Sequence, residues 1–186
     1  MATEISQLTA LIPPPTFVRR QDWHAAEKTL HTTLPDDYKT LVDTYGEGLF
    51  FDTVRLWAPG EGEHSITTAG PAEVDGFLTM IREDLADDPE PDLARLPDGQ
   101  LHTVDLGGPN AAPPYLSWGI GSDGDVGFWH RTGDDPNRWP ILYGQVQAWD
   151  YHPDGLLPYL IGILAGSINS NCFTGAQAHT FTAVEY

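Results

Sequence analysis

The clearest pattern of apolar and polar positions lies between residues 34 and 46. Apolar side chains repeat there at the i, i+3, i+4 and i+7 spacing of one helix face: Tyr38, Leu41, Val42 and Tyr45. Pro35 suits a first helical turn, where its missing N–H costs nothing, and Asp36 and Asp37 place negative charge at the positive end of the helix dipole. Gly46 supplies the left-handed residue that ends many helices. The segment therefore predicts a helix that stops at Gly46.

Three more segments predict helices. One begins after Asp22 as N-cap, and its apolar stripe consists of Trp23, Ala26 and Leu30. Another is amphipathic at ideal spacing: Val74, Phe77, Leu78, Ile81 and Leu85. The last, capped by Asp154 and closed by Gly166, is apolar on every side from Leu156 to Leu164 and must be buried. Residues 1–16, which end in three prolines, predict a short extended lead-in instead.

Alternating apolar and polar positions predict the strands. Leu49–Trp57 is aromatic and β-branched and predicts one strand, and Leu101–Leu106 predicts a weaker one. Leu116, Trp118 and Ile120 alternate up to Asp123-Gly124, and Val126, Phe128 and His130 alternate away from it, which is a strong signal for a hairpin turning at Gly124. A strand pair is expected around residues 140–143 and 146–149, and a final edge strand within 179–186.

This order predicts an α+β fold in which a single, mostly antiparallel sheet is flanked by about four helices. The length of 186 residues fits one domain, with a core over about residues 17–166 and a tail over 167–186. The one cysteine, Cys172, excludes an internal disulfide and a cysteine zinc cluster, which favours the cytoplasm. The N-terminus lacks the pattern of a signal peptide, and the longest apolar stretch, residues 156–165, is far short of the roughly 20 that span a bilayer.

The charge balance changes the functional picture. Nine basic residues against 27 acidic ones give a formal net charge of −18. Such a surface repels phosphate backbones, so direct binding of nucleic acid is disfavoured. A basic protein partner would instead be steered toward it. Solubility, or an organism with acidic proteins in general, explains the same charge and stays open as an alternative.

Sequence motifs for catalysis or metal binding are weak. Gly119 to Gly124 match the dinucleotide fingerprint G-x-G-x-x-G, but a strand follows in place of the required helix. With Val126 the segment also matches a kinase glycine-rich loop, yet no Lys follows Lys39 and no kinase catalytic loop occurs. No two of the seven histidines have the i, i+4 spacing of a helical zinc site, and no G-x-S-x-G occurs. We therefore expect no cofactor and no metal, although a catalytic site dispersed along the chain stays open.

A family resemblance emerges from these residues. The run Leu34-Pro35-Asp36-Asp37-Tyr38-Lys39, with Leu41 and Tyr45-Gly46 before an aromatic strand, resembles the opening motif of the Smi/Knr family within the SUKH superfamily. The later elements are similar in order: a middle strand, a Gly-x-Asp-Gly-Asp hairpin, an aromatic strand with Trp129, a strand pair, and an apolar helix ending in Leu164-Ala165-Gly166. The resemblance covers about residues 17–166. The acidic insertion after residue 85 and the tail beyond Gly166 depart from the family pattern.

The resemblance implies an α+β fold and the role of a non-enzymatic immunity protein, which binds and blocks a cognate toxin, often a nuclease. Eukaryotic relatives act in cell-wall regulation through protein contacts, and no catalytic residue carries over. The motif residues are then expected to be structural: Pro35, Tyr38, Leu41, Gly46, Gly124 and Trp129. The tail and the insertion would be individual to this chain.

Charge density alone selects the candidate partner-binding residues. The first group lies at and beyond the end of the third expected helix: Asp84, Asp87, Asp88, Glu90 and Asp92. Asp134 and Asp135 form the second. Two other functions remain open: a regulatory or scaffolding protein without a toxin, and a small hydrolase, which predicts a pocket where a histidine and a carboxylate converge with perturbed pKa values. No oligomeric state is predicted.

Overall fold

The computed structural model describes residues 2–87, 93–96, 98–103, 114–145 and 148–184. Within them the chain forms five α-helices: α1 (Ala2–Leu11), α2 (Trp23–Leu30), α3 (Asp36–Tyr45), α4 (Ala69–Asp87) and α5 (Leu156–Leu164). A short 3-10 helix, η1, spans Pro136–Arg138. The strands are β1 (Gly48–Phe50), β2 (Val54–Leu56), β3 (Leu93–Arg95), β4 (Leu101–Thr103), β5 (Tyr115–Gly121), β6 (Val126–His130), β7 (Ile141–Gln145), β8 (Ala148–His152) and β9 (Phe181–Ala183).

All these strands join one sheet in the order β4-β3-β8-β7-β6-β5-β2-β1-β9. Neighbouring strands are antiparallel except β3 and β8, which run parallel. The predicted α+β fold with a single, mostly antiparallel sheet is therefore confirmed. The Asp123-Gly124 hairpin lies between β5 and β6, and the expected edge strand is β9. Residues 104–106 of the weaker predicted strand and residues 146–147 lie outside the described part.

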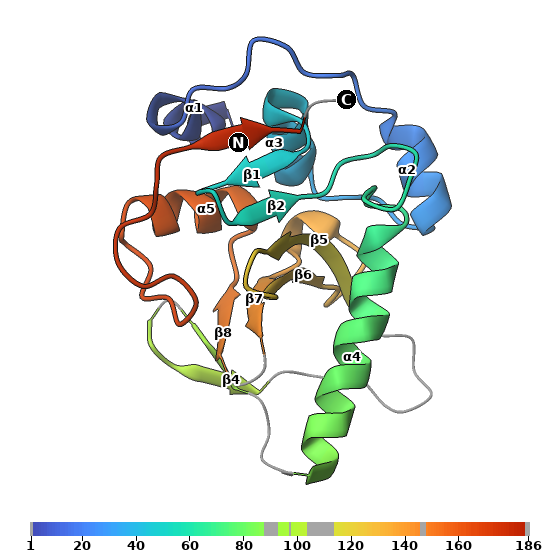
Figure 1. Cartoon of the computed structure of the whole chain (residues 1–186), viewed down its shortest axis with the longest axis vertical. Helices are drawn as coiled ribbons and strands as arrows, with labels where there is room; N and C mark the ends of the chain where they lie inside the picture. Colours follow the sequence, from blue (N-terminus) through green and yellow to red (C-terminus); the bar gives the residue numbers. More distant parts are fainter. Residues whose placement is uncertain (1, 88–92, 97, 104–113, 146–147, 185–186) are drawn as a thin grey trace.

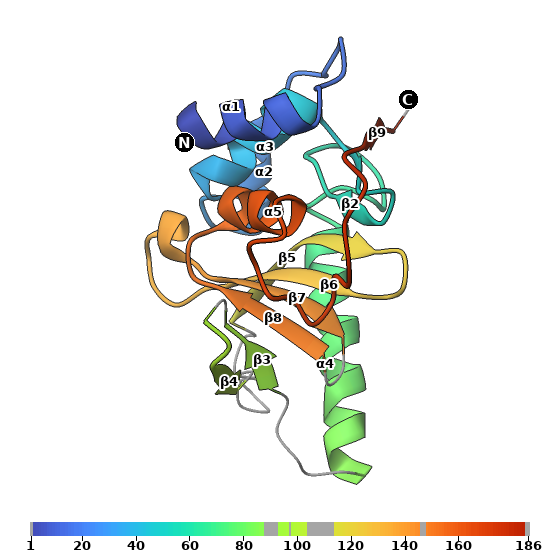
Figure 2. The same cartoon turned by 90° about the vertical axis from the view of Figure 1, so that its left-hand side faces the viewer.

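Helices cover both faces of the central strands. The helical layer, formed by α1, α2, α3 and α5, lies on one face, and α4 crosses the other (Figures 1 and 2). Trp118, Trp129 and Tyr143 point into the core beneath the helical layer. Phe128 and Trp149 pack with α4 in a second cluster on the opposite face. The central strands are thus buried on both sides, which explains why almost every residue of β5 and β6 is buried.

The expected helices after Asp22 and Pro35 form as α2 and α3. The Asp22 carboxylate accepts a hydrogen bond from the backbone N–H of Ala25 at 2.9 Å, so it caps α2 as predicted. The four apolar positions of α3 are all buried. Gly46 ends α3 with φ of +77°, a conformation that favours glycine, and its N–H donates to the carbonyl of Val42.

The prediction of an extended lead-in over residues 1–16 was wrong for its first part, because Ala2–Leu11 form helix α1. Leu8 and Ile12 are almost fully buried, and α1 packs against α5. Short helices are marginal in water, so burial of one face against a neighbour stabilises this helix. The proline run that suggested an extended segment comes after the helix and does not lie within it.

The single strand expected over Leu49–Trp57 is a hairpin of β1 and β2. Phe51 and Asp52 adopt positive φ angles of 59° and 61°, and the N–H of Thr53 donates to the carbonyl of Phe50 at 3.1 Å. Asparagine, aspartate and glycine are the usual residues for such turns. The turn was not predicted because Phe51 is a bulky residue that turns disfavour. Burial of its ring offsets the strain of its backbone.

The N-terminus of α5 is capped from another helix rather than by Asp154. Asp37 of α3 accepts hydrogen bonds through Oδ2 from the N–H groups of Leu156 at 2.7 Å and Leu157 at 3.1 Å. Its Oδ1 accepts from the N–H of Tyr38 at 2.7 Å. Asp37 thereby ties α3 to α5. Gly166 comes after the helix as expected, with φ of +62° and its N–H donating to Ile163.

None of the helices in the described ranges combines the length and apolar character needed to cross a bilayer.

Replacing Asp37 tests this cap. Asp37→Ala should lower the free energy of unfolding by about 1–3 kcal/mol, because it leaves three backbone N–H groups, those of Tyr38, Leu156 and Leu157, without their acceptor. Asp37→Asn keeps an acceptor oxygen and should lose less. Urea unfolding followed by circular dichroism measures both. An equal loss of unfolding free energy in the two variants would show that the acceptor oxygen of residue 37 does not stabilise the fold.

The same variants test the pH dependence of stability. Burial raises the pKa of Asp37, although the hydrogen bonds from Leu157, Tyr38 and Leu156 oppose the shift. The folded carboxyl therefore keeps its proton to higher pH than the unfolded one. Its contribution to stability is fully present below the unfolded pKa of about 3.9 and is lost as the pH rises through the folded pKa. The stability of the wild type relative to Asp37→Asn should fall as the pH rises, and parallel curves would contradict this.

Candidate protein-binding surface

Three exposed carboxylates gather where η1 meets the start of α3. Asp135 caps η1, accepting a hydrogen bond from the N–H of Asn137 at 3.1 Å. The Asn137 amide then reaches across the chain to Asp36: its Oδ1 accepts from the Asp36 N–H at 2.7 Å, and its Nδ2 donates to Asp36 Oδ2 at 3.1 Å. We call Asp36, Asp134 and Asp135 the acidic ridge; all three are exposed.

The loop that carries the acidic ridge is anchored to the core. Trp139, which comes directly after η1, is almost fully buried, and its Nε1 donates to the carbonyl of Gly133 at 2.7 Å. The capped turn therefore holds the carboxylates on an ordered framework. Arg138 is the one cation between residues 132 and 140. The sequence selected Asp134 and Asp135 by charge and did not select Asp36, which hydrogen-bonds to Asn137, 101 positions further along the chain.

The first predicted acidic group lies elsewhere. Asp84 and Asp87 belong to the last turns of α4. Asp88, Glu90 and Asp92 lie outside the described residues. In Figure 2 the far end of α4 is well separated from η1, which lies in the yellow-orange segment at the opposite side of the sheet. The end of α4 that carries Asp84 and Asp87 therefore lies apart from the turn that carries Asp134 and Asp135.

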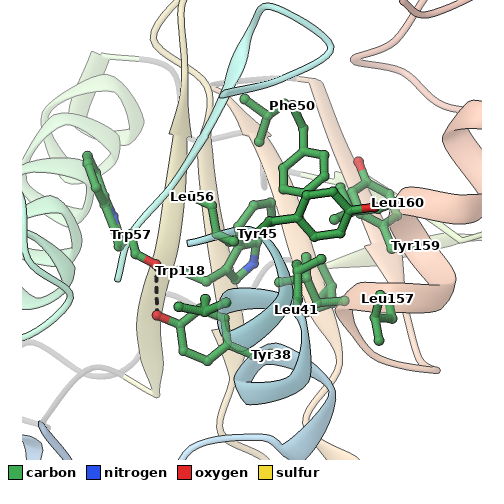
Figure 3. Packing of buried hydrophobic residues seen from close by; sticks show 14 of the residues in the cluster. Tyr38, Leu41, Tyr45, Phe50, Leu56, Trp57, Trp118, Leu157, Tyr159 and Leu160 are labelled. Atoms are coloured by element: carbon green, nitrogen blue, oxygen red, sulfur yellow. Dashed lines mark hydrogen bonds between the residues drawn. The ribbon is translucent and has the colours of Figure 1, made fainter. Parts of the chain in front are cut away.

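Tyr38, Leu41 and Trp129, three of the motif residues expected to be structural, lie in the core. The Tyr38 ring meets Trp129 edge to face at 4.9 Å between centroids, and its hydroxyl donates to the carbonyl of Trp57 at 2.9 Å (Figure 3). Leu41 is fully buried beside it. Pro35 stands at the N-cap of α3. Gly124 sits in the β5–β6 turn with φ of +89°, where a side chain would be strained.

One surface cavity brings a histidine close to carboxylates, as the hydrolase hypothesis requires. A cavity of about 410 Å³ is lined in part by Arg55, Glu47, His64 and Glu63. Glu47 forms an ion pair with Arg55, whose guanidinium lies 5.7 Å from the Trp57 ring centroid. His64 Nε2 lies 3.8 Å from Glu63 Oε1, with side chains 55% and 87% exposed. This pair faces bulk water, so it lacks the desolvation that tunes a catalytic dyad.

A smaller cavity of about 160 Å³ is lined by ionisable groups whose pKa values are raised. It is lined by Asp125, Tyr143 and Cys172, among others. Burial raises the pKa of Asp125, with a smaller contribution from the charge of Asp123. Burial and the nearby Asp125 raise the pKa of Tyr143. Burial, then the charges of Asp150 and Asp125, raise the pKa of Cys172. A protonated thiol is a poor nucleophile, so this cavity does not activate Cys172.

Two buried acidic or basic side chains play structural parts. Asp150 accepts hydrogen bonds from the Tyr159 hydroxyl at 2.9 Å and from the N–H of Asn171 at 2.7 Å, and a short one from the Ser170 hydroxyl. It thereby fastens the start of the tail to β8. Burial lowers the pKa of His152, whose Nδ1 accepts from the N–H of Asp154 at 3.3 Å. Across the described ranges, no group of three His, Cys, Asp or Glu residues is arranged to hold a metal ion.

A comparison with models of protein families, with curated proteins and with solved structures found no match for this chain. Its interpretation therefore depends on its own residues.

The reactivity of Cys172 separates a structural thiol from a nucleophile. Its Sγ donates to the carbonyls of Tyr143 at 3.3 Å and Ala148 at 3.4 Å, and it is the only cysteine of the chain. In the native protein we expect alkylation by iodoacetamide to be roughly tenfold or more slower than in urea. Mass spectrometry of the labelled chain gives both rates.

Ser170→Ala is the matched variant. The Ser170 hydroxyl accepts from the N–H groups of Cys172 and Phe173, so its loss should loosen the segment and accelerate labelling of the native chain. Native labelling as fast as that of the unfolded chain would instead revive Cys172 as a candidate nucleophile.

Proposed function

We propose that this chain is a cytoplasmic, non-catalytic immunity-type protein that binds and neutralises a cognate protein toxin. The observation that carries the proposal is the acidic ridge on a chain of net charge −18. All three carboxylates are exposed; that of Asp135 caps η1 and that of Asp36 accepts from Asn137, so these two lose little conformational entropy when a partner binds them. A basic cleft, such as that of a nuclease, is the complementary surface.

The interior supports the same proposal. Tyr38, Leu41 and Trp129, which belong to the motifs of the sequence, are buried and pack in the core. The cavity at His64 pairs an exposed histidine with an exposed carboxylate, and the cavity at Cys172 holds a thiol whose pKa is raised by burial. Neither arrangement favours acid–base or nucleophilic chemistry. A regulatory or scaffolding protein without a toxin would use the same surface, and genes encoded beside this one distinguish the two.

The direct test is protection. The proteins encoded next to this gene are each expressed in a host with and without this chain, and growth is measured to find one that is toxic alone. We expect the chain to restore growth and to be retained with the toxin in an affinity pull-down from the native organism, identified by mass spectrometry. Absence of protection, with turnover of a metabolite by the purified chain, would overturn the proposal in favour of an enzyme.

The acidic ridge makes a sharper prediction for that complex. Asp134→Asn with Asp135→Asn should lower the association rate about threefold to tenfold at low salt, with a smaller effect at high salt, because electrostatic steering is screened. Asparagine keeps the cap of η1. Glu61→Gln with Glu63→Gln removes the same charge from other exposed positions and should change the rate less. Stopped-flow or surface plasmon resonance measures both, and equal effects would remove the ridge from the interface.

A further inference from the structure

The last strand is attached to the sheet by few contacts. β9 pairs with β1 through three residue pairs, with Phe181 opposite Phe50. Two hydrogen bonds extend the ladder, from the N–H of Phe51 to the carbonyl of Thr180 at 3.1 Å and from the N–H of Val184 to the carbonyl of Glu47 at 3.0 Å. Phe181 is the one large apolar side chain in β9, and its two strand neighbours are exposed.

Phe181 occupies a seat that the rest of the chain forms for it. Its ring lies 5.0 Å from that of Tyr45 and 4.7 Å from that of Phe50, centroid to centroid. Gly48 leaves room for it, because a Cβ at that position would overlap the Phe181 ring and the carbonyl of Thr182. We call Tyr45 and strand β1 (Gly48–Phe50) the β1 seat. Tyr45 and Phe50 are buried core residues, so the seat is part of the scaffold.

The tail before β9 is divided into a fixed part and an exposed part. Asp150 fastens Ser170 and Asn171, and Phe173 stacks on Tyr143 at 5.0 Å with an angle of 18°. From residue 174 to residue 180 every residue except Gln177 is exposed. Meanwhile β1 keeps its three residue pairs with β2. β9 can therefore leave β1 while β1 stays paired with β2 and the clamped segment stays in place, at the cost of exposing the rings of Tyr45 and Phe50.

We propose that the β1 seat is a docking site for an extended segment of a protein partner with an aromatic side chain at the position of Phe181, and that β9 is an internal competitor for it. Recognition by strand addition uses main-chain hydrogen bonds for affinity and side-chain pockets for specificity, and β9 displays both. The inference rests on the proposed function in taking the ligand to be a protein, and it adds how that protein would dock.

Charge selects the kind of segment. The exposed Asp52 lies at the β1–β2 turn, where its Oδ1 accepts from the Thr180 hydroxyl at 3.0 Å. A segment with Lys or Arg at the place of Thr180 would add an ion pair there. A second copy of the chain, exchanging its tail, would have to approach against a net charge of −18 on each molecule. The seat therefore favours a basic, aromatic segment of a different protein.

The test uses the full chain and a fluorescent peptide with the sequence of residues 176–184. In the wild type the tethered strand competes at high effective concentration; in Phe181→Ala the competitor is weakened. We expect the peptide to bind Phe181→Ala at least about tenfold more tightly than the wild type, measured by fluorescence anisotropy. A peptide in which alanine replaces its phenylalanine should not bind. Replacing the threonine at position 180 of the peptide by lysine should tighten binding at low salt.

A second variant keeps the test sharp. Gly48→Ala combined with Phe181→Ala fills the seat and should abolish peptide binding, while circular dichroism checks that both variants stay folded. Equal, weak binding to folded Phe181→Ala and wild type would overturn the proposal. If Phe181→Ala formed concentration-dependent dimers and did not bind the peptide, the proposal would also be overturned, because the β1 seat would then bind a second copy of the chain. Neither result depends on a toxin, so failure here and failure of the protection experiment are distinguishable.

Discussion

The side chain of Tyr38 points from α3 toward the sheet, and the rest of the fold depends on the contacts of its ring and the hydrogen bond of its hydroxyl. The side chain is fully buried, its ring meets Trp129 edge to face, and its hydroxyl donates to the carbonyl of Trp57. A buried hydroxyl without an acceptor would cost about 1–3 kcal/mol, so the hydrogen bond ties α3 to the chain just after β2. Asp37, the preceding residue, then fixes α5 against α3. Two adjacent side chains thus set the position of the helical layer.

Both surfaces that we assign to partners begin at the ends of this helix. Asp36 stands at its first residue and contributes to the acidic ridge through Asn137. Tyr45 stands at its last residue and contributes to the β1 seat through Phe181. Ten helical residues separate the two surfaces by about 15 Å along the axis. Because Tyr38 anchors α3 to the core, the acidic ridge and the β1 seat each have a fixed position relative to the core.

The parts of this fold that the sequence predicts are those whose signals are local. The helix of Tyr38 and the hairpin of Gly124 carry spacing, cap and turn residues within a few positions of each other. The predictions that failed concern elements that depend on distant partners. Helix α1 is stabilised by packing on α5, and the cap of α5 comes from Asp37, 119 positions before Leu156. The turn at Phe51 uses a residue that turn statistics disfavour.

The same distinction between local and distant signals applies to the candidate surfaces. Charge density selected Asp134 and Asp135, because two adjacent acidic residues in a polar loop can be recognised from the sequence alone. It could not find Asp36, because a carboxylate at the start of a helix already has a local explanation in the helix dipole. The β1 seat was equally hidden, since Gly48 has no signal of its own before Phe181 is seen to fill the space above it.

Long-range attraction and short-range docking place different demands on such a surface. Charge acts over about a Debye length of 8–10 Å and tolerates changes of a residue or two, whereas strand addition requires a matched ladder and an aromatic side chain in one place. The acidic ridge meets the first demand with exposed carboxylates on a capped turn. The β1 seat meets the second with the strand edge that β9 now occupies, next to buried rings. A partner that uses both would be drawn in by charge and selected by the seat, and β9 would set the affinity threshold that a wrong partner must exceed.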